Sequence, residues 1–109
     1  MMNTEQTVMS LKALAQSTRL AVFRLLMKRG TNGLPAGAIA EQLQIPQNTL
    51  SAHLNILSNA GLIAADRQGR KLIYSVQIGA IRQFIGYLVN DCCDGHPDIC
   101  AITVNTCEE

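Results

Sequence analysis

The sequence contains no apolar run that approaches the roughly 18 to 20 residues needed to cross a bilayer. Its first ten residues contain Glu5 but neither lysine nor arginine, so the basic region of a secretory signal peptide is missing as well. There is no low-complexity segment and no internal repeat with the period of roughly 20 to 50 residues that solenoids show. These absences predict a protein without membrane contact that works in the cytoplasm.

Acidic residues are scarce in most of the chain. Residues 10–82 hold all nine Lys and Arg but only Glu41 and Asp66, which gives this body a net charge of +7 in a chain whose total is +1. Residues 83–109 carry five acidic residues and no basic one, so an acidic tail follows the basic body. This asymmetry favours a polyanionic partner, although a solvated basic face without any partner has the same composition.

Composition excludes disorder, and length excludes a second globular domain. With 48% hydrophobic and 16% charged residues the chain can build a core, and 109 residues correspond to one domain. Cysteine is missing from the body, because all four cysteines lie in the last 18 residues, at Cys92, Cys93, Cys100 and Cys107. Clustered thiols in a reducing compartment indicate metal ligands or a redox sensor and argue against a disulfide framework.

The first part of the body has a helical period. Apolar residues at helical spacing predict two helices, over residues 7–15 and 18–29, with Ser17 as the N-cap of the second. Pro35 is expected in the first turn of a third, short helix over residues 35–44, because proline suits that position.

A fourth helix is expected from Pro46 to Asn59, with Gly61 closing it. Its inner face is an apolar stripe of Leu50, Leu54 and Leu57. Its outer face carries short uncharged side chains, which can form hydrogen bonds but no ion pairs. The face consists of Gln47, Asn48, Ser51, Ala52 and Asn55.

The period then changes from helical to alternating. Residues 62–76 predict a β-hairpin with Gly69 at the turn and with three basic residues at its tip, Arg67, Arg70 and Lys71. The helical period returns over residues 77–90, which predicts a final amphipathic helix. The expected fold is mainly α with a small β-hairpin, in the order α-α-α-α-β-β-α.

The third and fourth helices have the dimensions of a helix-turn-helix, and the hairpin behind them has the place of a wing. Each feature alone is weak, because polar helix faces and basic turns are often only solvated. Together they suit double-stranded DNA: short polar side chains fit base edges, and a basic tip fits phosphates or the minor groove. The predicted DNA contacts are Gln47, Asn48, Thr49, Ser51, His53, Asn55, Arg67, Arg70 and Lys71.

Three segments resemble the ArsR family of winged-helix metalloregulators: residues 14–20 (LAQSTRL), 50–63 (LSAHLNILSNAGLI) and 67–75 (RQGRKLIYS). The pattern S-x-H-L-x-x-L-x-x-A-G-L followed by a short R-x-G-R wing is specific in combination, and the resemblance covers residues 7–90. It implies a homodimer, formed by the first and last helices, that represses transcription of its operator until an inducer binds. His53 belongs to the pattern and either contacts a DNA phosphate or packs beside the core.

The resemblance leaves the inducer open, because family members place their metal sites on different helices. Arsenic sensors that resemble the family's namesake carry a C-V-C pair at the first helix of the helix-turn-helix, where residues 34–38 here are Leu, Pro, Ala, Gly and Ala. Zinc sensors of the family carry histidines and carboxylates on the last helix, and residues 77–90 contain neither.

A C-C-x6-C arrangement directly after the last helix resembles the arsenic-responsive repressors that have C-terminal thiols. Trivalent arsenic or antimony takes three soft thiolate ligands, so Cys92, Cys93 and Cys100 are the predicted inducer site. Cys107 could replace or join them. His96 could complete a Cys3His set for zinc, although adjacent ligands do not match the usual spacing of structural zinc sites.

The predicted organisation is a winged helix-turn-helix domain over residues 1–90 and a cysteine-rich, inducer-binding tail over residues 91–109. A thiol redox switch on the same DNA-binding body is an alternative to metalloid sensing. An enzyme is not expected, because the chain has neither a C-x-x-C in a βαβ context nor a Gly-rich phosphate loop. No small organic substrate is expected either.

Overall fold

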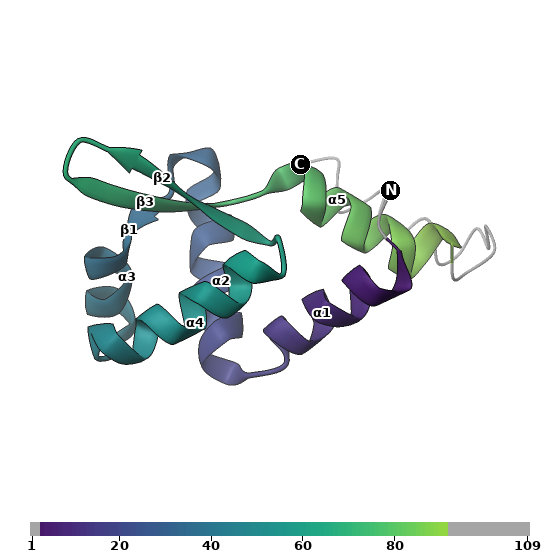
Figure 1. Ribbon diagram of the computed structural model, residues 1–109, viewed down its shortest axis with the longest axis horizontal. Coiled ribbons are helices and arrows are strands. Elements are labelled where there is room, and N and C mark those ends of the chain that lie inside the picture. The colour runs from purple at the N-terminus through teal and green to yellow at the C-terminus, as the bar shows by residue number, and fades with distance from the viewer. Residues whose placement is uncertain (1–2, 92–109) are drawn as a thin grey trace.

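The computed structural model describes residues 3–91, and the predicted tail with its four cysteines lies outside them. This part of the chain forms five α-helices and three short strands, arranged as Figure 1 shows. In chain order the elements are α1 (Thr4–Leu14), α2 (Ser17–Arg29), the 3-10 turn η1 (Gly30–Asn32), β1 (Leu34–Pro35), α3 (Ala36–Leu43), α4 (Gln47–Asn59), β2 (Ile63–Gln68), β3 (Lys71–Val76), α5 (Ile78–Gly86) and the π-helical turn η2 (Tyr87–Asp91).

The first two helices begin at residues that differ from the predicted ones. α1 starts at Thr4, three residues before the predicted start, because Asn3 and Gln6 form a reciprocal capping box. The N-cap of α2 is Gln16, whose side-chain oxygen accepts from the Arg19 backbone N–H at 2.9 Å. The prediction of Ser17 as this cap was therefore wrong, and Ser17 is the first helical residue.

The residue predicted to begin the third helix, Pro35, belongs to the sheet instead. Leu34 and Pro35 form a short strand that pairs antiparallel with β3, so the wing belongs to a three-stranded sheet of order β1-β3-β2. Pro35 is the N-cap of α3 and does not occupy the first turn, because its backbone is held extended by this pairing. Gly33 makes the approach possible: its φ is +68°, and an added Cβ would collide with the Tyr74 carbonyl oxygen.

The hairpin is confirmed. β2 and β3 pair from Ile63 opposite Val76 to Gln68 opposite Lys71, which leaves a two-residue turn at the tip. Gly69 in that turn has a φ of +67°, the conformation that such turns demand and glycine tolerates.

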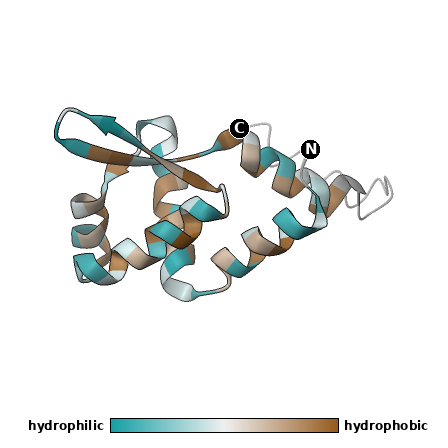
Figure 2. Ribbon diagram, viewed as in Figure 1, coloured by the Kyte–Doolittle hydropathy of each residue, from teal (hydrophilic) through white to brown (hydrophobic). Residues whose placement is uncertain are grey.

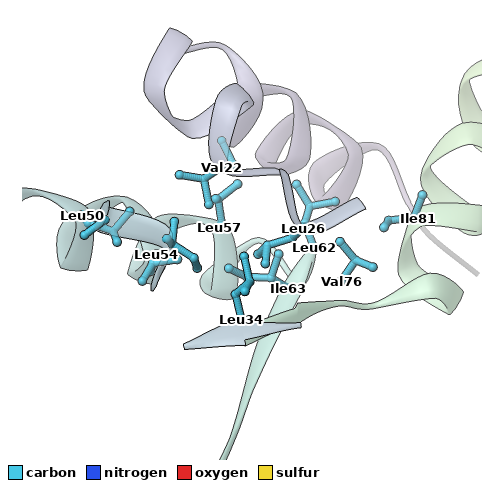
Figure 3. Close-up of a cluster of buried hydrophobic side chains, with 13 residues drawn as sticks. Val22, Leu26, Leu34, Leu50, Leu54, Leu57, Leu62, Ile63, Val76 and Ile81 are labelled. Carbon is cyan, nitrogen blue, oxygen red and sulfur yellow. The ribbon is translucent and has the colours of Figure 1, made fainter. Parts of the chain in front are cut away.

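A single cluster of aliphatic side chains holds the body together (Figure 3). Leu50, Leu54 and Leu57, the predicted stripe of the fourth helix, are at most 1% exposed. They pack with side chains from α2 and the sheet, and the main ones are Val22, Leu26, Leu62 and Ile63. The face of α4 opposite this stripe must therefore point away from the core.

α1 and α5 project from the body on one side and form what we call the arm (Figure 1). Their far ends meet where the hydroxyl groups of Thr4 and Tyr87 form a short hydrogen bond of 2.5 Å. α5 ends at Gly86 and continues as the π-helical turn, so the prediction of one uninterrupted helix over residues 77–90 was wrong at its end. Within residues 3–91, no helix has the length and apolarity that a bilayer crossing requires.

Candidate nucleic-acid interface

α3 and α4 are joined by a tight turn that directs α4 outward. α3 ends at Gln44, which adopts the left-handed conformation with a φ of 56°, and the Ile45 N–H then donates to the Ala40 carbonyl oxygen at 3.0 Å. Pro46 follows in an extended conformation as the N-cap of α4. This helix, turn and helix, with the hairpin beside it, is the arrangement predicted from the sequence.

The outer face of α4 is polar, uncharged and solvent-exposed. All the DNA contacts predicted on α4 except His53 are exposed: Gln47, Asn48, Thr49, Ser51 and Asn55. Two of them also hold the start of the helix, since the Asn48 side-chain oxygen accepts from the Thr49 N–H at 2.9 Å and the Ser51 hydroxyl donates to the Gln47 carbonyl at 3.1 Å. Asn48 therefore keeps its NH₂ group, and Ser51 its hydroxyl lone pairs, for an outside partner.

The tip of the wing carries the basic residues. Arg67, Arg70 and Lys71 are exposed, and the tip extends beyond the body on the side opposite the arm (Figure 1). Hydrophilic residues flank the turn in Figure 2, where both strands are teal near the tip. We call these three residues and the polar face of α4 the DNA face. Its positive charge and uncharged donors suit phosphates and base edges, respectively.

His53 differs from the other predicted contacts because it is half-buried. Its ring Nδ1 lies 3.3 Å from Nη1 of Arg19, which belongs to α2. Arg19 lies in residues 14–20, one of the segments that carry the family resemblance, but the sequence analysis assigned it no role. Its partner in space is 34 positions away in the chain, so only the fold reveals the pair.

Residues 3–91 contain no group of three His, Cys, Asp or Glu side chains that could hold a metal ion. The predicted inducer ligands Cys92, Cys93 and Cys100 lie outside the described residues, and so do His96 and Cys107. The prediction of an inducer site at these residues therefore stays a prediction.

The geometry defines a winged helix-turn-helix DNA-binding domain, and comparison with known proteins agrees. A family model described as a helix-turn-helix domain matches residues 14–64. The transcriptional repressor SdpR of Bacillus subtilis is 34% identical over 88 residues, which cover 81% of this chain and 94% of that protein.

Solved structures share the fold. A homodimeric winged helix-turn-helix DNA-binding domain from Mycobacterium bovis, described as a possible ArsR-family transcriptional regulator, is 31% identical with a TM-score of 0.65, covering 85% of this chain and 82% of that one. An ArsR-like transcriptional regulator from Rhodococcus sp. RHA1 has a TM-score of 0.74 at 21% identity, covering 90% of each chain. The chain belongs to the ArsR family of winged helix-turn-helix transcriptional regulators, which bind DNA.

Proposed function

We propose that this protein is a homodimeric transcriptional repressor that leaves its operator when the C-terminal thiolates bind trivalent arsenic or antimony. The DNA-binding part of this proposal rests on the DNA face, which combines exposed, uncharged hydrogen-bonding groups on α4 with a basic wing tip. A matching face on a second copy would read the second half of a palindromic operator, one helical turn away.

The arm supports dimerisation. It exposes large apolar side chains that the body leaves uncovered: Val8 and Leu11 on α1 and Ile78 on α5 are between 41 and 45% exposed, and Leu88 in η2 is 38% exposed. Uncovered aliphatic groups on two neighbouring helices favour burial against a second copy of the same surface. The M. bovis relative is a homodimer, which is consistent with this arrangement.

The position of the tail supports a link between inducer and dimer. Cys92 follows Asp91, the last residue of the π-helical turn, so three bonds from Cys92, Cys93 and Cys100 to one arsenic atom would act on this turn directly. Tyr87 in the turn is hydrogen-bonded to Thr4 at the start of α1. A structural change at the end of α5 would therefore be passed to α1, the other helix of the arm. It would thereby change the angle between the two subunits of the proposed dimer.

The test is binding of the reduced protein to DNA from upstream of its own gene, followed by fluorescence anisotropy during titration with arsenite, antimonite, zinc or peroxide. We expect arsenite or antimonite to release the DNA, and Cys92→Ser, Cys93→Ser and Cys100→Ser each to abolish that release. Cys107→Ser tests whether the fourth thiol replaces or joins one of these ligands. Release by zinc alone, with dependence on His96, would replace the metalloid with a Cys3His zinc site, and release by peroxide alone would indicate the redox switch.

A further inference from the structure

One side chain connects three helices of the structure. From α2, the Arg19 guanidinium donates through Nε to the Ala13 carbonyl oxygen at 2.6 Å and through Nη2 to the Lys12 carbonyl oxygen at 3.4 Å, both at the end of α1. Its Nη1 lies 3.3 Å from Nδ1 of His53, in the middle of α4. Arg19 thus joins a helix of the arm to the helix that carries the DNA face.

The Arg19 contacts to α1 are the kind that hold a helix end firmly. α1 ends at Leu14 with Ala15 as its C-cap and without a left-handed glycine, and the Ala15 N–H donates to the Lys12 carbonyl oxygen at 3.2 Å. The other carbonyl groups of the last turn, including that of Ala13, need donors from elsewhere. A guanidinium supplies charge-assisted hydrogen bonds and a positive charge at the negative end of the helix dipole. The backbone of Arg19 is itself held by the cap from Gln16, which limits where its side chain can reach.

The contact to His53 constrains the tautomer of the imidazole. Because arginine has only donors, a hydrogen bond between the two side chains requires the ring Nδ1 as acceptor, which is the tautomer with its proton on Nε2. The Arg19 contact from α2 thus orients the ring, and His53 is half-buried whereas Ser51 and Asn55 on α4 are exposed.

Apart from Arg19, the packing of α1 against the body involves one large apolar side chain, Leu14, which is half-buried against the core. The buried residues of α1 are all small, Thr7, Ser10 and Ala13. Small side chains make shallow ridges, which interlock weakly with the grooves of a neighbouring helix. Directional hydrogen bonds at the end of the helix then have a large share in its orientation.

We propose that Arg19 and His53 are a positioning pair that sets the orientation of α4 relative to α1, and thereby the distance between the two DNA faces of the dimer. His53 then affects DNA binding through Arg19, without touching a phosphate. This inference rests on the proposed dimer, because only a dimer converts the angle between α1 and α4 into a spacing between half-sites.

The test uses the full-length protein and a set of palindromic operators whose half-sites are moved by one or two base pairs in either direction. Arg19→Met removes every donor at similar length, and His53→Leu removes the acceptor. His53→Asn keeps an oxygen acceptor near the position of Nδ1, and Arg24→Met removes an exposed arginine of the same helix as the matched control.

We expect Arg19→Met and His53→Leu each to weaken binding at the preferred spacing by about tenfold. The preference among spacings should flatten, while the salt dependence of binding stays at its wild-type slope. The variant that carries both Arg19→Met and His53→Leu should bind DNA about as tightly as the single variant with the larger loss, because both substitutions remove the same contact. His53→Asn should retain most of the affinity and the spacing preference, and Arg24→Met should retain the spacing preference.

A lower salt slope for His53→Leu would show that His53 contacts a phosphate and would overturn the proposal. Additive losses with an intact spacing preference would overturn it too. If thermal unfolding shows that Arg19→Met is not folded, the comparison of His53→Leu with His53→Asn still tests the proposal. A wild-type protein that binds without any spacing preference would refute the dimer itself, which separates failure of the proposed function from failure of the pair.

Discussion

The body and the first helix of the arm are built in opposite ways. In the body, large aliphatic side chains such as Leu50, Leu54 and Leu57 are buried, and the outer face of α4 is polar. In α1 the buried residues are small, and Val8 and Leu11 are exposed. α1 therefore leaves large apolar side chains available for another subunit, whereas its partner in the arm, α5, buries Ile81 and Phe84.

The largest expected effect comes from the core of the body. Leu54→Ala should lower the free energy of unfolding by about 2 to 5 kcal/mol, because Leu54 is fully buried and the shortened side chain leaves a cavity. Urea unfolding followed by circular dichroism measures the loss. Leu72→Ala in the wing is the control, since Leu72 is 39% exposed and should cost much less. Equal losses would mean that the wing is covered in the folded protein.

The next effect tests the arm. Leu11→Glu should raise the dimer dissociation constant by about a hundredfold, because a carboxylate would be buried without a partner between the subunits. Sedimentation equilibrium measures it. Leu20→Glu, which alters an exposed leucine of α2 outside the arm, should leave the dimer intact. Dissociation by the Leu20 variant alone would place the interface on α2.

The junction between β1 and β3 is tested at a glycine. Gly33→Ala should destabilise the protein by about 1 to 3 kcal/mol, because φ is positive there and the new methyl group meets the backbone of Tyr74. Gly37→Ala in α3 is the matched change, with open space around it and ordinary helical geometry. It should raise stability by about 0.5 to 1 kcal/mol. Thermal unfolding of both variants measures whether each substitution lowers or raises the stability.

A smaller effect separates the charges of the wing from those of the arm. Arg70→Ala should weaken binding to all DNA sequences alike and lower the slope of log affinity against log salt by about 0.9, the value for one phosphate contact. Arg82→Ala, an exposed arginine on α5, should leave the slope unchanged. Anisotropy titrations over a range of salt concentrations measure both. An unaltered slope for Arg70→Ala would remove this residue from the phosphate contacts.

The smallest effect is a gain in stability. The Ser10 hydroxyl of α1 is fully buried and finds no hydrogen-bond partner within residues 3–91. Ser10→Ala should therefore stabilise the protein by about 1 kcal/mol, since it removes an unpaired polar group. Ser17→Ala, at an exposed position, should change little. A loss of stability for the Ser10 variant would show that the hydroxyl has a partner in the dimer.

Local patterns predicted α4 and the wing well. The stripe of Leu50, Leu54 and Leu57 has the helical period, and Gly69 has the conformation that a two-residue turn requires, so both elements follow from neighbouring residues. The start of α1 also had a local signal that the prediction overlooked, since Asn3 and Gln6 stand at capping-box spacing.

The incorrect predictions depend on contacts that the local sequence does not encode. Pro35 reads as a helix start, but its pairing with Ile73 of β3 makes it the end of a strand. The π-helical turn after Gly86 has no distinctive composition. The role of the predicted ligands Cys92, Cys93 and Cys100 stays a prediction, because these residues lie outside residues 3–91.

Local patterns in the sequence were enough to predict the helix-turn-helix and the basic wing, and they put all four thiols after the part of the chain predicted to bind DNA. They were enough because periodicity, turn chemistry and charge act between residues that are close in the chain. Three other features are visible only in the folded chain: β1 joins the wing, α1 exposes Val8 and Leu11, and Arg19 meets His53. Each of these features depends on which distant segments pack together, and local sequence patterns do not show this.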